Sequence, residues 1–153
     1  MIKIMFVCHG NICRSPMAEF ILKKMVKERG IADKFEIASS ATSTEEIGNG
    51  IYPPAKRELT AREVEFSYDK RAVQLKKSDY EKYDLFVGMD SANICNMHRI
   101  FGGDPAGKIR KLMDYTSRGG DVSDPWYSDR FDIAYSDIRE GCRCLLNALE
   151  SEI

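Results

Sequence analysis

The sequence predicts an α/β protein, with a single domain built on a four-stranded parallel sheet and helices on both faces. Four short apolar segments alternate along the chain with stretches of helical periodicity, a pattern typical of parallel sheets covered by helices. The length of 153 residues suits one domain. Because no linker, repeat or low-complexity segment divides the chain, we expect this domain to span residues 1–153.

Apolar runs and helix-boundary signals predict the first elements. Residues 2–7 (IKIMFV) are typical of a buried strand, and residues 35–40 (FEIASS) form a second predicted strand. A helix is expected between them, from Pro16 to Arg29. Ser15 fits the cap before this helix, and a proline fits its first position.

The middle of the chain continues the alternation. Two prolines open a predicted helix over residues 53–64. Ser78 and Glu81 have the spacing of a capping box for a short helix. Residues 84–89 (DLFVGM) are the third predicted strand, and a helix over 91–101 follows it.

The last third holds one strand, one long loop and one helix. Residues 108–113 (KIRKLM) are the fourth predicted strand, and residues 114–129 lack clear structure. Long loops in compact domains are more often functional than idle. The final helix is predicted by apolar residues mostly three or four positions apart: Ile133, Ile138, Cys142, Leu145, Leu146 and Leu149.

Composition and charge argue against several classes of function. The net charge is −1 and the calculated pI is about 6.2, so a nucleic-acid partner has no general electrostatic support. The apolar run Ile4–Cys8 is too short for a signal peptide or a membrane span, so we expect a cytoplasmic protein with no membrane partner. The five cysteines are scattered and odd in number, which argues against a disulfide framework. Their spacing is not that of zinc ligands, and we expect no metal or cofactor.

The motif that indicates chemistry is the string CHGNICRSP, between the first strand and the first helix. Cys8 ends the strand, where ligands bind in parallel sheets, and Arg14 follows six residues later. Gly10 and Asn11 are residue types that tolerate left-handed backbone angles, which a tightly curled loop requires. The amides of this loop and of the helix start can together form a cradle for an anion.

These residue types point to phosphate chemistry on a cysteine. A thiol inside a ring of amides and beside a cation ionises easily and becomes a nucleophile. Arg14 offers a planar fork that matches two oxygens of a phosphate. A cysteine and an arginine at this spacing also arise by chance, and free cysteines are commonly buried apolar residues. The preceding strand and the following helix start favour the catalytic interpretation.

The string VCHGNICRSPMAE resembles the signature of the low-molecular-weight protein tyrosine phosphatases. The resemblance covers nearly the whole chain and includes the strings SSATS, KRAVQL, LFVGMD and DPWY. It implies a four-stranded parallel sheet flanked by helices. It also implies metal-independent hydrolysis of phosphotyrosine proteins and small aryl phosphates through a phosphocysteine. We expect the protein itself to be a monomer or a weak homodimer.

The resemblance also implies a role for each matching residue. Cys8 is the expected nucleophile, Arg14 binds phosphate and the transition state, and Asp124 is the general acid. Ser15 is expected to hydrogen-bond the thiolate, and Asn11 to hold the curvature of the loop. The predicted substrate-binding residues are His9, Gly10, Asn11, Ile12, Cys13, Ser15, Trp126 and Tyr127. Cys13 matches a second loop cysteine that can form a reversible disulfide with the nucleophile.

The long loop carries the predicted acid and an aromatic pair. One carboxyl group can protonate a leaving phenolate and then deprotonate the attacking water, which typically contributes about 10²–10⁴-fold in rate. An Asp-Pro pair is also a common turn. The rivals of Asp124 on sequence alone are Asp114, Asp121 and Asp129. Trp126 and Tyr127 either pin the loop to the core or wall a slot for a flat ring, and the resemblance favours the slot.

Three alternatives use a similar cysteine loop. Arsenate reductases of this fold add two cysteines after the third strand, where this chain has only Cys95. Protein arginine phosphatases carry a threonine where this loop has Ile12, whose bulk favours a tyrosyl substrate. A cysteine phosphocarrier needs no general acid, and the string DPWY argues against that role.

Two positions depart from better-known members of the resembling family. Thr44-Glu45-Glu46 occupies a place at the cleft rim where an aromatic residue is common, which predicts weaker binding of acidic peptides and tolerance of basic ones. The two glutamates are equally typical of a solvated surface. Lys70 stands where many members carry a histidine in the network behind the loop.

Overall fold

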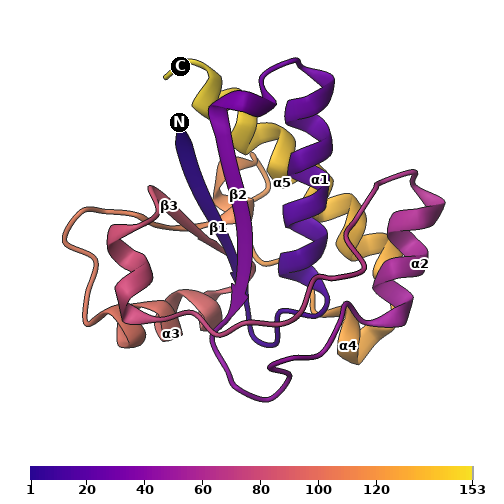
Figure 1. Ribbon diagram of the computed structural model, residues 1–153, viewed down its shortest axis with the longest axis horizontal. Coiled ribbons are helices and arrows are strands. Elements are labelled where there is room, and N and C mark those ends of the chain that lie inside the picture. Colours follow the sequence, from indigo (N-terminus) through magenta and orange to yellow (C-terminus); the bar gives the residue numbers. More distant parts are fainter. Residues whose placement is uncertain (153) are drawn as a thin grey trace.

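The four apolar segments form one parallel sheet in the computed structural model, which describes residues 1–152 (Figure 1). The strands are β1 (Ile2–Cys8), β2 (Phe35–Ala41), β3 (Leu85–Gly88) and β4 (Ile109–Lys111), in the order β2-β1-β3-β4. The central strand β1 is buried from its third residue onward, as expected of a strand covered on both faces. The predicted fold class is confirmed.

Helices connect the strands and cover both faces of the sheet. The α-helices are α1 (Arg14–Glu28), α2 (Pro53–Ala61), α3 (Ser91–Phe101), α4 (Pro125–Ser128) and α5 (Phe131–Glu150). Short 3₁₀ turns are η1 (Ala32–Lys34), η2 (Lys77–Glu81) and η3 (Leu112–Tyr115). Among the described residues, no helix combines the length and the apolar character needed to span a membrane.

The alternation of side chains along β1 divides the core in two. Ile4 and Phe6 join the larger cluster, which includes apolar residues of α1, α2 and α5. Met5 and Val7 point to the opposite face and pack with residues of β3, η2 and α3. Figure 1 shows α1 and α5 side by side, with α3 on the other side of the strands.

The strand order places a crevice at the carboxyl end of β1. From β1 the chain crosses to β2 on one side, and it later returns to β3 on the other side. Ligands bind at such a switch in open α/β sheets. The loop after β1, the start of α3 and α4 lie at this end of the sheet, whereas the start of β1 and the end of α5 lie at the opposite end (Figure 1).

The start of α1 differs from the prediction. The helix begins at Arg14, two residues earlier than expected, and Cys13 rather than Ser15 occupies the cap position. Ser15 makes no capping bond because its hydroxyl contacts Cys8 and Asn11 instead. The Ser15 side chain therefore bonds to residues of the preceding loop and does not cap the helix.

Further differences concern the fourth strand, α2 and η2. The fourth strand stops at Lys111, because residues 112–115 form η3 against α5. Leu112 lies so close to Gly141 that a Cβ atom on Gly141 would be 2.5 Å from Leu112 Cγ. Helix α2 ends at Ala61, before the left-handed Glu63. The turn η2 is closed by Asp79 accepting from the Lys76 amide, not by the predicted Ser78–Glu81 pair.

Candidate active site

The thiol of Cys8 lies at the bottom of a curled loop between β1 and α1. Only 3% of Cys8 is exposed, and its Sγ lies 3.0 Å from Ser15 Oγ. The main-chain N–H of Asn11 donates to the same sulfur at 3.3 Å. A main-chain N–H and a hydroxyl therefore both face the sulfur, and both are groups that can donate to it.

Asn11 holds the loop in its curled shape. Its φ of 59° places it in the left-handed region. Its Nδ2 donates to Ser15 Oγ at 2.8 Å and to Ser39 Oγ at 3.0 Å. Its Oδ1 accepts from Lys70 Nζ at 2.9 Å and from the Val73 amide at 3.1 Å. Every hydrogen-bonding group of this buried amide is satisfied, which fixes its orientation.

The orientation of Asn11 makes Ser15 Oγ an acceptor. The single hydrogen of the Ser15 hydroxyl then has two acceptors within reach, a thiolate at Cys8 Sγ at 3.0 Å and the Ser40 carbonyl at 3.5 Å. A hydroxyl that donates to sulfur stabilises negative charge there. Such a bond also makes the sulfur a better leaving group.

Gly10 does not adopt the left-handed conformation that its residue type tolerates. Its φ is not positive, and Asn11 alone supplies that conformation within the loop. The missing side chain leaves room instead for a neighbour: a Cβ on Gly10 would lie 3.4 Å from Glu46 Cγ. Gly10 therefore allows the segment after β2 to approach the loop between β1 and α1.

A buried polar chain extends behind the loop. Ser39 Oγ, which accepts from Asn11, donates to Glu19 Oε1 at 2.6 Å. Glu19 is 5% exposed and pairs with Lys23 at 2.6 Å. Lys70 also donates to the Ser39 carbonyl at 3.2 Å. Burial lowers the pKa of Lys70, and the nearby Glu19 opposes that shift.

The guanidinium of Arg14 is fixed by two acceptors. Nη1 donates to Asp90 Oδ2 at 2.8 Å and to the Val122 carbonyl at 2.9 Å, and the side chain is 4% exposed. Burial alone would lower the pKa of Arg14, but the charges of Cys8, Asp90 and Asp124 outweigh it and raise that pKa. The arginine therefore stays charged beside the sulfur and is held in place before any ligand arrives.

Asp124 lies close to this arginine. Its Oδ2 is 3.6 Å from Arg14 Nη2, and its Oδ1 caps α4 by accepting from the Trp126 amide at 3.0 Å. Its side chain is 31% exposed, so water and substrate can reach the carboxyl group. Asp124 is thus both buttressed by a helix start and open to the crevice.

The crevice above Cys8 has a volume of about 410 Å³. Its lining residues are Cys8, His9, Gly10, Ile12, Cys13, Arg14, Glu45, Glu46, Asp124, Trp126 and Tyr127. Trp126 packs against Tyr52, with ring centroids 4.8 Å apart and ring planes tilted by 47°, and Tyr127 is 85% exposed at the rim. Trp126 therefore anchors the loop, and both aromatic residues border the crevice.

The second loop cysteine has a different character from the first. Burial, followed by the charges of Cys8 and Asp124, raises the pKa of Cys13, so its thiol stays protonated. Both loop cysteines are free thiols in this structure. The disulfide between them stays a prediction.

The structure brings the predicted residues together at one edge of the sheet. Asn11 and Ser15 lie behind Cys8, and the other predicted residues line the crevice. Sequence reasoning missed Glu19, Ser39 and Asp90. The position of Asp90 directly after the third strand was a usable signal, because strand ends of a parallel sheet meet at one edge. No group of three or more His, Cys, Asp or Glu side chains suited to a metal ion occurs within residues 1–152.

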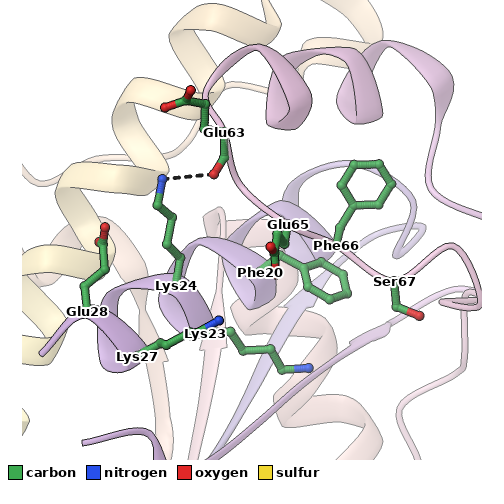
Figure 2. A pocket seen from close by; sticks show the side chains of 9 residues that line it. All are labelled: Phe20, Lys23, Lys24, Lys27, Glu28, Glu63, Glu65, Phe66 and Ser67. Atoms are coloured by element: carbon green, nitrogen blue, oxygen red, sulfur yellow. Dashed lines mark hydrogen bonds between the residues drawn. The ribbon is translucent and has the colours of Figure 1, made fainter. Parts of the chain in front are cut away.

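A larger hollow of about 690 Å³ lies away from this edge, between α1 and the segment after α2 (Figure 2). Its lining residues are Phe20, Lys23, Lys24, Lys27, Glu28, Glu63, Glu65, Phe66 and Ser67. Lys24 Nζ donates to the Glu63 carbonyl across it, as the dashed line in Figure 2 shows. Its lining contains three lysines and three glutamates, whose charges balance, and no cysteine, so we assign no catalytic function to this hollow.

Comparison with known proteins gives a consistent result. A model of the family "Low molecular weight phosphotyrosine protein phosphatase" matches residues 3–153. The curated relative YfkJ of Bacillus subtilis, a low molecular weight protein-tyrosine-phosphatase, is 34% identical over 157 residues, which cover 99% of this chain and 98% of the relative.

Solved structures agree with the sequence matches. The crystal structure of YfkJ has a TM-score of 0.94 at 32% identity and covers 99% of this chain and 96% of its own. SP-PTP, a low molecular weight protein tyrosine phosphatase from Streptococcus pyogenes, has a TM-score of 0.89 at 36% identity, with coverages of 97% and 93%. DARP, a drosophila arginine phosphatase, has a TM-score of 0.88 at 25% identity, with coverages of 99% and 100%.

Proposed function

Because this chain belongs to the low molecular weight phosphotyrosine protein phosphatase family, we propose that it hydrolyses phosphotyrosine in proteins, and small aryl phosphates, through a phosphocysteine. The observation that carries the proposal is the sulfur of Cys8 between two hydrogen-bond donors, with the fixed guanidinium of Arg14 beside it. This set binds one tetrahedral dianion and presents one nucleophile to it.

In the first step, Cys8 Sγ attacks the phosphorus, a sulfur–phosphorus bond forms, and the bond to the phenolic oxygen breaks. The amides of the loop and Arg14 hold the equatorial oxygens, over which the charge of the transition state is spread. Asp124, in its protonated form, gives its proton to the leaving phenolate. Its exposure to the crevice is consistent with this contact.

In the second step, water attacks the phosphocysteine. The Asp124 carboxylate, left after the first transfer, accepts a proton from the water, and the sulfur leaves as thiolate. The hydroxyl of Ser15 supports this departure, because a thiolate at 3.0 Å is a nearer acceptor for its hydrogen than the Ser40 carbonyl at 3.5 Å. Inorganic phosphate then leaves and the cycle closes without an external acid or base.

The test is steady-state turnover of p-nitrophenyl phosphate and of a phosphotyrosine peptide in the presence of a chelator. We expect wild-type turnover to persist, Cys8→Ser to abolish it, and Asp124→Ala to lower kcat by about 10²–10⁴-fold. The exposed Cys95→Ser is the matched control and is expected to behave as wild type. Stoichiometric labelling of Cys8 without turnover would instead indicate a phosphocarrier.

Arginine dephosphorylation is the second candidate, because DARP shares the fold at 25% identity. Ile12 is 7% exposed and borders the crevice, where its bulk favours a flat ring over a flexible guanidinium. We expect kcat/KM for a phosphotyrosine peptide to exceed that for the matched phosphoarginine peptide. Ile12→Thr is expected to reduce the ratio of kcat/KM for the phosphotyrosine peptide to kcat/KM for the phosphoarginine peptide. The reverse preference in the wild type would favour the second candidate.

A further inference from the structure

The rim of the crevice carries an excess of carboxylates. Glu45, Glu46 and Asp124 border it, whereas the positive groups are Arg14 at the bottom and His9 at the edge. Arg14 is already engaged by Asp90, and no lysine borders the crevice in the described part of the chain. A site built to accept a phosphate dianion therefore has an entrance that repels further negative charge.

The backbone that carries the two glutamates is bonded to the catalytic loop. The amide and hydroxyl of Ser43 donate to the His9 carbonyl at 3.0 and 2.9 Å. The Thr42 amide donates to the Cys8 carbonyl at 3.0 Å, and the Tyr52 amide to the Ile12 carbonyl at 2.9 Å. The segment between β2 and α2 therefore keeps its carboxylates at the mouth of the site.

The two side chains differ in how their charge is met. Glu45 Oε2 lies 2.9 Å from His9 Nε2, so a protonated imidazole can offset its charge. Glu46 Oε2 accepts from the neutral Asn49 amide at 2.6 Å, which orients the carboxylate and leaves its charge in place. The approach of Glu46 Cγ to Gly10 brings this charge beside the loop that receives the phosphate.

We infer that Glu46, assisted by Glu45, forms a cation-binding subsite, and that the protein substrates carry a lysine or arginine next to the phosphotyrosine. This inference rests on the proposed function and narrows its substrate class. A basic neighbour pairs with the rim carboxylates while the phosphate occupies the cradle. An acidic neighbour meets the same carboxylates and is repelled.

The test uses three phosphotyrosine peptides of one length, with lysine, alanine or glutamate on both sides of the phosphotyrosine. Exposed ion pairs are weak individually, so we expect kcat/KM to fall about tenfold from the lysine peptide to the glutamate peptide. The change should appear in KM rather than kcat, because Glu45 and Glu46 have no part in the proposed chemical steps. Added salt should reduce the ratio, since the rim is exposed.

Variants assign the preference to the rim. Glu46→Gln is expected to bring the ratio of kcat/KM for the lysine peptide to kcat/KM for the glutamate peptide close to one. Glu45→Gln should lower this ratio less, and Glu46→Lys should bring it below one. Glu65→Gln removes an exposed carboxylate near the hollow of Figure 2 and is expected to leave the ratio unchanged. Of these variants, only the control Glu65→Gln is expected to hydrolyse p-nitrophenyl phosphate as the wild type does. The Glu45 and Glu46 variants should still hydrolyse it, and because this substrate has no neighbouring residues, any change in its KM measures the effect of the rim charge on the phosphate alone.

The outcomes separate this inference from the proposed function. Equal kcat/KM for the three peptides, or a preference for the glutamate peptide, would overturn the subsite and leave the phosphatase activity standing. A ratio unchanged in Glu46→Gln would overturn the assignment to this residue. Failure to hydrolyse any of the peptides or p-nitrophenyl phosphate would overturn both.

Discussion

Lys70 Nζ lies 2.9 Å from Asn11 Oδ1, so a charged side chain supports from behind the residue that curls the catalytic loop. The ammonium has no acceptor capacity, which forces the amide oxygen of Asn11 toward it and the amide nitrogen toward Ser15. A single lysine, 59 positions from Asn11 in the chain, thereby helps to orient the amide that donates to Ser15 Oγ, which lies 3.0 Å from Cys8 Sγ.

Replacing Lys70 should therefore impair catalysis without touching substrate. Lys70→Met leaves Asn11 Oδ1 with only the Val73 amide, and we expect kcat for p-nitrophenyl phosphate to fall about tenfold, as loss of one charge-assisted hydrogen bond suggests. Lys23→Met, which removes a more exposed ammonium from the same polar chain, is the control. A Lys70→Met enzyme with wild-type kcat and pH profile would contradict the positioning role.

Asp90 serves two structures with its two oxygens. Oδ1 caps α3 by accepting from the Asn93 amide at 2.9 Å, and Oδ2 holds Arg14. Asp90→Asn should keep the cap but lose the ion pair, so we expect kcat/KM to fall about tenfold or more with little loss of stability. Asp90→Ala should lose both and unfold about 1 kcal/mol more easily in urea. Equal activity of Asp90→Asn and wild type would contradict the role of the carboxylate.

The role of Asp124 as an acid predicts a dependence on the leaving group. An aryl phosphate with a strongly basic leaving group needs the proton, whereas one with an acidic leaving group, such as a dinitrophenol, needs it less. Asp124→Asn should therefore slow the first about 10²–10⁴-fold and the second much less, in burst-phase kinetics of the first step. A uniform loss for both substrates would indicate that Asp124 acts only through the position of Arg14.

The reactivity of two cysteines offers a direct contrast. Cys8 is 3% exposed and Cys95 is exposed, so accessibility alone predicts faster alkylation of Cys95. A main-chain N–H and a hydroxyl face Cys8 Sγ, and we expect iodoacetate to modify Cys8 first at neutral pH, as peptide mass spectrometry can show. Inorganic phosphate should protect Cys8 and leave Cys95 unaffected. Faster loss of Cys95 would contradict the electrostatic account of the loop.

The buried Cys142 predicts how stability changes in alkali. Burial raises the pKa of this thiol above its ordinary value of 9.0. Below pH 9 both states hold the proton, but above it the unfolded chain releases a proton that the folded chain keeps, so stability falls as pH rises. One group contributes about 1.4 kcal/mol between pH 8 and pH 10.

Cys142→Ala isolates this contribution. The cavity it creates costs stability at every pH, but the variant lacks the titrating group. The difference in unfolding free energy between wild type and variant should therefore shrink by about 1.4 kcal/mol from pH 8 to pH 10, in urea titrations. A difference that stays constant over this range would show that the thiol titrates alike in both states.

Local patterns predicted most of the fold. The strands Ile2–Cys8 and Phe35–Ala41 extend one residue beyond their predicted ends, and the helix Ser91–Phe101 has its predicted bounds. Errors arose where a distant contact outweighed a local rule. Ser15 looked like a helix cap but bonds to Cys8, and the last residues of the predicted fourth strand form η3 under α5.

The candidate site likewise contains residues that adjacent sequence predicts and residues that only distant contacts bring together. The cysteine loop and the Asp-Pro pair could be recognised from adjacent residues. The network behind them could not, since Asn11 meets Ser39 across 28 positions and Arg14 meets Asp90 across 76. Short polar residues such as Ser39 carry no pattern of their own, and only the pairing of β1 with β2 brings this serine to the loop.

The dependence of Arg14 on Asp90, and of Asn11 on Lys70, matters for protein engineering. Transplanting residues 8–15 alone into a foreign α/β scaffold would carry over the nucleophile but none of the distant side chains that orient it. A minimal graft needs the ends of three strands and a matching crossover. The proposed catalytic residues therefore depend on side chains from several segments that meet at one edge of the sheet. Recombination that exchanges contiguous segments should abolish activity more often than it prevents folding.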